Sequence, residues 1–266
     1  MNLFRLKIAF EFLWYWLSRP HRNGHGIHSP FLFAFLQEVF YSKTSDNSSL
    51  TAIRSLKIKA SKSKDVVNVN DLGAGSNRLK QSERSLSAIA GMSSISHKYG
   101  KLLNKSIGYF KPELILELGT CLGFGAMYMA LGYKKAKVIT IEGSDTLVGK
   151  SIENFKQMNM NNISVIHGNF DDLLPSILQK NDRFDFIFID GNHKKTAVLD
   201  YFKLCLPNIT SDSIIIVDDI RWSEDMLEAW REICDHKQVT LSIDLFRMGI
   251  VFFNSNLKKQ HFKIYY

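Results

Sequence analysis

The chain has 266 residues, a hydrophobic content of 45% and a formal charge of +8 from 34 basic and 26 acidic residues. This size and composition are typical of one globular core with an appendage, and no second full domain is required. The three cysteines, Cys121, Cys205 and Cys234, are dispersed and exclude a disulfide framework or a zinc motif, which favours a reducing compartment and predicts a cytoplasmic protein. The basic excess suggests a nucleic-acid partner, but the lysines are scattered, and we interpret them as solvated surface.

Residues 2–17 are apolar nearly all round and contain only three charged residues, Arg5, Lys7 and Glu11. This segment is too short and too charged to span a bilayer, and no cleavage site typical of a signal peptide follows it. It predicts a helix that has to be covered by the domain itself, by a second subunit in a homodimer, or by a membrane surface in a peripheral contact. Ser29 and Pro30 then predict the start of a second apolar helix.

Residues 42–64 are rich in Ser, Lys, Thr and Asn and predict a mobile connection. We therefore place a helical N-terminal extension and linker at residues 1–64 and the main domain at residues 65–266. Within that domain, residues 66–76 begin like a nucleotide-binding strand and turn, but no apolar helix and no strand with a terminal acid follow. We interpret them as a structured loop near the mouth of a pocket.

The most informative segment is residues 114–125, an apolar run that reaches Glu117 and opens into a turn containing Gly119 and Gly123. The run predicts a buried parallel strand, and the glycines let a ligand approach the backbone at the start of the next helix. Its Glu-x-Gly-x-x-x-Gly-x-Gly spacing differs from the Gly-x-Gly-x-x-Gly of dinucleotide sites. An acid at the strand end suits a cationic ligand such as S-adenosylmethionine, and Glu142, at the end of the next strand, can accept hydrogen bonds from both ribose hydroxyls.

Further apolar runs follow, separated by segments of helical length. Four of these runs end at acids or glycines, and this regular alternation predicts an α/β domain. The later strands are predicted at residues 163–167, 184–190, 213–217, 239–244 and 249–253.

With these motifs in order, residues 97–266 resemble the class I S-adenosylmethionine-dependent methyltransferases. The resemblance implies a Rossmann-like, doubly wound sheet of seven strands with an antiparallel C-terminal strand, here with the helical N-terminal extension, and a helix at residues 97–110. It also implies that residues 239–244 and 249–253 form the antiparallel pair that closes the sheet. Family members often carry Asp where this chain has Asn169. The resemblance assigns the cofactor contacts to Glu117, Gly119, Thr120, Gly123, Glu142, Gly143, Asn169, Phe170 and Asp190.

The pattern is most similar to the divalent-metal-dependent O-methyltransferases of the catechol, caffeoyl-coenzyme A and sugar types. In that branch an Asp after the fourth strand and an Asp-Asn pair after the fifth bind a cation, so the resemblance implies Mg²⁺, Mn²⁺ or Ca²⁺ at Asp190, Asp218 and Asp219. Asp219 replaces the family's Asn, and helix capping is the alternative for this pair. His193 stands where sugar O-methyltransferases carry the suspected base, and it is our candidate catalytic residue together with Asp190; its alternative is an exposed residue at a helix start.

The function that this resemblance implies is O-methylation of a small-molecule or sugar hydroxyl by S-adenosylmethionine, assisted by a divalent cation. Two alternatives remain. A nucleic-acid methyltransferase is motivated by the charge, but the chain lacks the Asn/Asp-Pro-Pro-aromatic signature of many base N-methyltransferases, so a nucleic-acid partner is not favoured. A catalytically silent scaffold of the same fold is the other, and the intact Glu117 and Glu142 argue against it.

Overall fold

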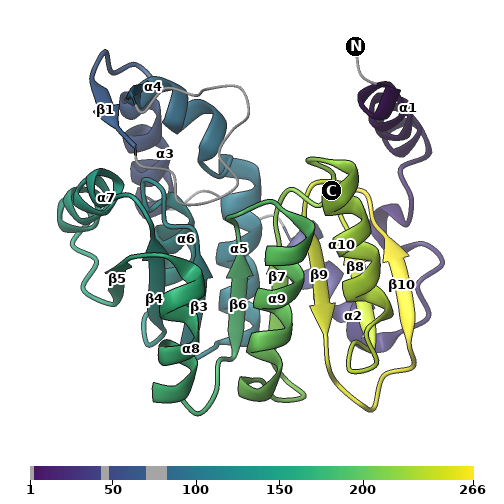
Figure 1. The fold of residues 1–266 in the computed structure, drawn as a ribbon. Helices are drawn as coiled ribbons and strands as arrows, with labels where there is room; N and C mark the ends of the chain where they lie inside the picture. The colour runs from purple at the N-terminus through teal and green to yellow at the C-terminus, as the bar shows by residue number, and fades with distance from the viewer. Residues whose placement is uncertain (1–2, 43–47, 70–82) are drawn as a thin grey trace. The chain divides into compact units, whose positions relative to one another are not determined.

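The computed structural model describes residues 3–42, 48–69 and 83–266, and it divides into two compact units (Figure 1). The central unit is Ser42–Lys180, and the terminal unit combines Met1–Tyr41 with Asn181–Tyr266. Each unit contains parallel strands that alternate with helices, so the predicted α/β class is confirmed. No helix in the described ranges is both long enough and apolar enough to cross a membrane.

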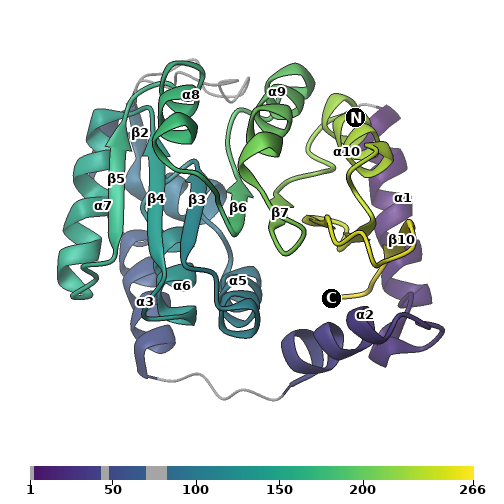
Figure 2. The ribbon, with the colours of Figure 1, turned by 90° about the horizontal axis from the view of Figure 1, so that it is seen from below.

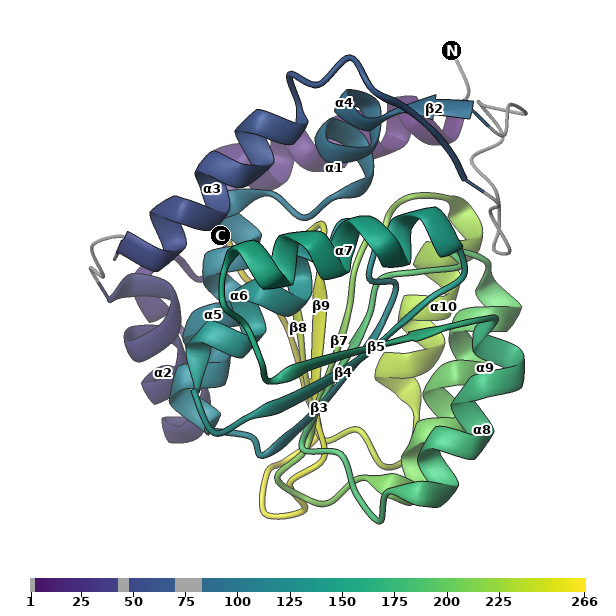
Figure 3. The same ribbon diagram turned by 90° about the vertical axis from the view of Figure 1, so that its left-hand side faces the viewer.

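The central unit contains three parallel strands, each followed by a helix. The elements are α5 (His97–Phe110), β3 (Leu114–Leu118), α6 (Phe124–Gly132), β4 (Lys137–Glu142), α7 (Asp145–Gln157), β5 (Ile163–His167) and α8 (Phe170–Lys180). The strand order is β3-β4-β5, with α5 and α6 on one face of these strands and α8 on the other (Figure 3). Because parallel strands end at one edge, the segments after β3, β4 and β5 lie together at that edge.

Residues 48–60 are a helix, α3 (Ser48–Ala60), where the composition predicted a mobile connection. Its buried residues, Leu50, Ile53 and Leu56, recur at intervals of three and form one apolar side. The prediction was wrong over these residues, because the Ser, Thr and Lys on the other side of the helix dominate the composition and hide the apolar spacing.

A small antiparallel sheet pairs β1 (Val66–Asn68) with β2 (Glu83–Ser85). It is followed by α4 (Leu86–Ala88) and η3 (Ile89–Ser93). The glycine-containing part of the loop predicted at residues 66–76 lies outside the described residues, so that interpretation stays a prediction.

The terminal unit contains five strands. Its elements after the central unit are β6 (Phe186–Ile189), α9 (Lys195–Cys205), η4 (Leu206–Asn208), β7 (Ile214–Val217), α10 (Glu224–Asp235), β8 (Leu241–Asp244), β9 (Gly249–Phe252) and β10 (Gln260–Lys263). The strand order is β10-β8-β9-β7-β6, and β9 runs antiparallel to both β7 and β8. The antiparallel pair is confirmed. Apart from the small sheet of β1 and β2, the described residues form eight strands rather than the predicted seven, because β10 adds in parallel to β8.

The N-terminal helices belong to the terminal unit. They are α1 (Leu3–Ser18), η1 (Arg22–Gly24), α2 (Pro30–Phe35) and η2 (Leu36–Tyr41). The start of α2 is as predicted, since the Ser29 hydroxyl accepts a hydrogen bond from the Leu32 amide at 3.3 Å. In Figure 2, α2 lies on the side of this unit's strands opposite α9 and α10. The rings of Phe31 and Phe35 pack against Phe252 with centroids 5.3 and 5.7 Å apart.

Candidate active site

Eight of the nine predicted cofactor contacts lie in the central unit, at the carboxyl ends of its three strands. Glu117 is near the end of β3, Glu142 ends β4, and Asn169 follows β5. The residues of the glycine turn follow β3 directly. Asp190, the ninth, belongs to the terminal unit. The structure therefore gathers the first eight at one edge of one sheet, where α/β domains bind their ligands.

The turn after β3 has a backbone that requires glycine. Gly119 has φ 109° and Gly123 has φ 81°, both in the left-handed region. A Cβ on Gly123 would lie 2.4 Å from the ring of the buried Phe155, so a side chain is also excluded by packing. The Gly119 amide donates to the Ile141 carbonyl at 3.1 Å, which ties the turn to β4. The two glycines thus let the turn stay tied to β4 where α6 begins.

The Glu142 carboxylate is fixed by two backbone amides. The Cys121 amide donates to Oε2 at 2.7 Å and the Ser144 amide donates to Oε1 at 2.9 Å. A carboxylate has about four acceptor positions, so one carboxylate can be held by two amides and also bind hydroxyl groups. Glu142 is therefore both an anchor of the glycine turn and a pre-oriented acceptor at the end of β4.

The loop after β5 is joined to the end of β4. The Gly168 amide donates to the Glu142 carbonyl at 2.9 Å, and the His167 Nε2 lies 3.2 Å from the Gly143 carbonyl. The side-chain oxygen of Asn169 accepts from the Asp171 amide at 3.3 Å, inside the loop. The side chain of Asn169 therefore stabilises its own loop as Asp would, and its nitrogen can still contact a ligand.

Glu117 is only 1% exposed. The sequence suggested instead a negative charge that faces a ligand at the end of the strand. The Thr140 hydroxyl donates to its Oε2 at 2.6 Å. Burial raises the pKa of Glu117 to about 8, the Thr140 bond lowers it, and the charge of Glu142 raises it. The expectation of a negative charge in the crevice is corrected, because the carboxyl is buried and burial favours its protonated form. The prediction that Glu117 contributes to the cofactor site stays a prediction.

We expect Glu117→Gln to remove a pH dependence of stability. Below pH 4.5 the carboxyl is protonated in the folded and unfolded chain alike, whereas between pH 4.5 and about 8 only the unfolded chain loses the proton. Wild-type unfolding free energy should therefore fall by about 2 kcal/mol more than that of the variant between pH 5 and pH 7. Urea unfolding at the two values measures this. Glu153→Gln, at an exposed glutamate on α7, is the control; equal slopes in Glu117→Gln and wild type would contradict the assignment.

In the terminal unit, two acids hold one guanidinium, and the charge of a third acid acts on it. Asp190 follows β6, and Asp218 and Asp219 follow β7. Arg247, from the turn between β8 and β9, donates from Nε and Nη2 to the two carboxylate oxygens of Asp218 at 3.1 and 2.8 Å. The same Nε lies 3.3 Å from Asp219 Oδ1. The charge of Asp190 also acts on Arg247.

The electrostatics of this cluster favour a charged Arg247. Burial alone would lower its pKa, but the charge and hydrogen bonds of Asp218 outweigh burial, and the pKa of Arg247 is raised. The pKa of Asp219 is raised by its burial and by the charge of Asp218, against the opposing effects of Arg247 and His193. Asp218 has no exposed surface, whereas the Arg247 side chain keeps 34% of its own. Arg247 can therefore meet a ligand, and Asp218 can act only through Arg247.

His193 lies beside this cluster. Its Nε2 is 3.9 Å from Asp219 Oδ2, and its ring centroid is 6.2 Å from that of Trp222. A quarter of the His193 side chain is exposed, so the imidazole is neither sealed in the core nor fully solvated. The preceding Asn192, at φ 50°, donates from its side chain to the Tyr201 hydroxyl at 2.8 Å, which fixes the loop to α9.

Helix capping does not occupy Asp218 or Asp219. The cap of α10 is Ser223, whose hydroxyl accepts from the Met226 amide at 3.1 Å. Asp219 has φ 51°, a left-handed conformation that Asn and Asp tolerate best among residues with a side chain. Asp219 therefore has a backbone conformation that Asn also tolerates.

The arrangement does not match the predicted divalent-cation site. Within residues 3–42, 48–69 and 83–266, no group of three or more His, Cys, Asp or Glu side chains is placed to hold a metal. The physical reason is Arg247, whose guanidinium already satisfies both oxygens of Asp218 and approaches Asp219. A hard cation would have to displace that guanidinium to obtain its oxygen ligands.

Arg247 is the functional candidate that sequence reasoning missed. Its signal was available, because strands ending at Asp244 and starting at Gly249 were predicted as an antiparallel pair. Gly249 pairs with Val217, so the turn before it lies at the carboxyl end of β7, next to Asp218. No general motif marks an arginine in such a turn.

The chain matches known methyltransferases in sequence. Residues 116–220 match the family model of a methyltransferase domain. Over 130 residues the chain is 29% identical to a catechol O-methyltransferase of Niastella koreensis, a match that covers 48% of this chain and 58% of that protein. The matched part therefore spans little more than half of this curated relative.

Solved methyltransferases share the fold. The Podospora anserina methyltransferase PaMTH1, bound to S-adenosylhomocysteine, has a TM-score of 0.61 at 16% identity, covering 85% of this chain and 97% of that one. The O-methyltransferase from Bacillus cereus in complex with S-adenosylhomocysteine gives 0.56 at 19%, covering 82% and 97%. The Streptomyces achromogenes O-methyltransferase TomG of tomaymycin synthesis, in complex with S-adenosylmethionine, gives 0.57 at 15%, covering 82% and 96%. The Rossmann-like fold is confirmed, and residues 116–220 of the chain match a methyltransferase domain.

Proposed function

We propose that this protein transfers the methyl group of S-adenosylmethionine to a hydroxyl oxygen of a small molecule or a sugar. The observation that carries the proposal is Glu142, held by two amides at the end of β4 beside the glycine turn, where a ribose can be bound. The O-methyltransferases among its relatives support oxygen as the acceptor atom. The dispersed positions of Cys121, Cys205 and Cys234 support a reducing compartment, the cytoplasm, as the place of the reaction.

In this reaction an oxygen lone pair attacks the methyl carbon, the bond from carbon to sulfur breaks, and S-adenosylhomocysteine leaves. The hydroxyl proton has to go to a base, and the imidazole of His193 is suited to accept it. Asp219, with Oδ2 at 3.9 Å from His193 Nε2, stabilises the imidazolium that forms. Asp219 is thus a positioning and electrostatic partner of His193.

Positive charge near the acceptor oxygen comes from Arg247 in this proposal. The donor set at Asp190, Asp218 and Asp219 does not fit Mg²⁺, Mn²⁺ or Ca²⁺ while Arg247 holds Asp218, so no step is assigned to a cation. A guanidinium offers several donors in one plane and stabilises an oxygen as it loses its proton. The exposed third of the Arg247 side chain is available for this contact.

We expect Glu142→Ala to weaken S-adenosylhomocysteine binding about 30-fold, because it removes charge-assisted hydrogen bonds to the ribose and releases the Cys121 amide. Isothermal titration calorimetry measures the affinity. Glu142→Gln should fall in between, since it keeps one oxygen acceptor. Glu153→Ala, at an exposed side chain on α7, should bind as wild type does. A wild-type protein that binds no S-adenosylhomocysteine would refute the proposed function.

A further inference from the structure

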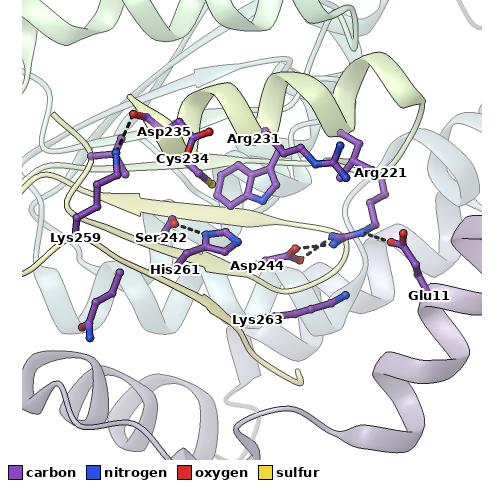
Figure 4. Close-up of a pocket in the computed structure, with 14 residues that line it drawn as sticks. Glu11, Arg221, Arg231, Cys234, Asp235, Ser242, Asp244, Lys259, His261 and Lys263 are labelled. Atoms are coloured by element: carbon purple, nitrogen blue, oxygen red, sulfur yellow. Dashed lines mark hydrogen bonds and ion pairs between the residues drawn. The ribbon is translucent and has the colours of Figure 1, made fainter. Parts of the chain in front are cut away.

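Helix α1 is fixed to the terminal unit by one face. Tyr15 is 3% exposed, and its hydroxyl donates to the Ile264 carbonyl at 2.7 Å and accepts from the Tyr266 amide at 2.8 Å. Glu11, on the same side of the helix, points to Arg221, with Oε2 3.5 Å from Nε (Figure 4). The orientation of α1 within this unit is therefore set by buried hydrogen bonds and an ion pair.

Glu11 and Arg221 border a pocket of about 730 Å³ between α1, α10 and the strands β8 and β10. Figure 4 shows the side chains that line it. Both carboxylate oxygens of Asp244 are held by Arg221 at 2.7 and 2.6 Å. None of the predicted site residues lines this pocket. The inner face of α1 is thus connected to a network of charges on the sheet, and the only acid of the helix is used there.

The opposite face of α1 is apolar and exposed. Six large side chains on it keep between 47% and 81% of their surface in solvent. A continuous apolar surface of this kind is uncommon on a protein that has no partner for it. The six residues are Leu3, Phe10, Leu13, Trp14, Trp16 and Leu17.

The order of residues around the helix is specific. With about 100° between successive residues, the leucines and Phe10 occupy the middle of the exposed face. Trp14 lies at one edge with Lys7 just beyond it, and Trp16 lies at the other edge with Arg5 just beyond it. Both cations are exposed. The apolar face is therefore bordered on each side by a tryptophan and then a positive charge.

We propose that α1 lies in the surface of a membrane that contains anionic lipids. Tryptophan rings prefer the level of the lipid headgroups, and lysine and arginine beside them attract lipid phosphates, so this order matches a helix lying in the plane of the interface. The excess positive charge of the chain acts in the same direction. At 16 residues the helix lies on the bilayer rather than across it.

Charge argues against a second copy of the chain on this face. In a two-fold interface the same patch meets itself, which brings the cations at its borders together. The helix offers them no acid in return, because Glu11 faces Arg221 on the other side. An anionic lipid surface supplies the complementary charge that a second copy lacks.

The experiment is co-sedimentation of the full chain with vesicles of phosphatidylcholine alone or with one quarter phosphatidylglycerol. Wild type should bind the anionic vesicles at least about tenfold more strongly than the neutral ones, and high salt should weaken this binding. Trp14→Ser with Trp16→Ser, and Arg5→Gln with Lys7→Gln, should each reduce binding about tenfold. The control pair Met92→Ser with Ile152→Ser removes exposed apolar groups from the central unit and should have no effect.

Two outcomes would overturn the proposal. One is wild type that binds neither kind of vesicle. The other is a dimer in analytical ultracentrifugation that the Trp14 and Trp16 substitutions dissociate, with equal binding to neutral and anionic vesicles, which would assign the face to a second copy. Circular dichroism of each variant shows that it is folded. The test measures vesicle binding and not methyl transfer, so its result does not depend on the proposed function.

Discussion

Replacing Arg247 with alanine should destabilise the protein by about 3 kcal/mol and open a divalent-cation site at Asp190, Asp218 and Asp219. Asp218 has no exposed surface, so without the guanidinium its charge is buried and uncompensated. Mg²⁺ or Mn²⁺ can then enter among the acids at 190, 218 and 219 and restore part of the lost stability. Urea unfolding in EDTA and in millimolar cation measures both effects. Methyl transfer should fall about 100-fold in the variant.

The matched control is Arg183→Ala, which breaks the ion pair between an exposed arginine and the half-buried Asp185 in the same unit and should cost less than about 1 kcal/mol with no response to cation. Wild-type activity should be the same in EDTA and in Mg²⁺. The assignment of Arg247 is contradicted if EDTA abolishes wild-type activity, or if Mg²⁺ stabilises wild type as much as it stabilises Arg247→Ala. Either result would support a bound cation at Asp190, Asp218 and Asp219.

The fold could be predicted where a buried strand ends at a residue with a distinctive chemical role. β5 has the predicted bounds, and β7 differs from its predicted bounds by one residue, because an apolar run bounded by turn residues has few alternatives. β10 could not be found in this way. It reads Gln-His-Phe-Lys and lies at the edge of the sheet, where two of its four side chains are exposed, so no apolar run marks it.

The two halves of the candidate site differ in the same respect. The central unit's residues follow one another along the sequence at three strand ends, so Glu142 and the glycine turn could be assigned from spacing. The cluster in the terminal unit depends on a contact between residues far apart in sequence, Asp218 and Arg247, across an antiparallel pair. A resemblance in the acids alone predicted a cation, and only the packing of the β8–β9 turn shows which positive group lies there.

His193→Gln should lower kcat about 100-fold to 1000-fold while leaving the affinity for S-adenosylhomocysteine unchanged. Glutamine keeps the size and the hydrogen-bonding capacity of the side chain, but it cannot take the proton that the acceptor hydroxyl loses. The cofactor contacts assigned to the central unit are untouched by the change. Kinetics with a catechol or a sugar as trial acceptor measure kcat, and calorimetry measures the affinity.

The pH profile separates a base from a structural role for His193. A reaction that needs a base slows at acidic pH, so the wild-type kcat should have an acidic limb, and this limb should be absent in His193→Gln. Asp219→Asn should retain the limb with a lower kcat, because it removes the charge 3.9 Å from Nε2 but leaves the imidazole. His25→Gln, at an exposed histidine of the same unit, is the control for loss of an imidazole elsewhere. A variant at position 193 that keeps more than about a third of kcat, or that keeps the acidic limb, would mean that another group takes the proton.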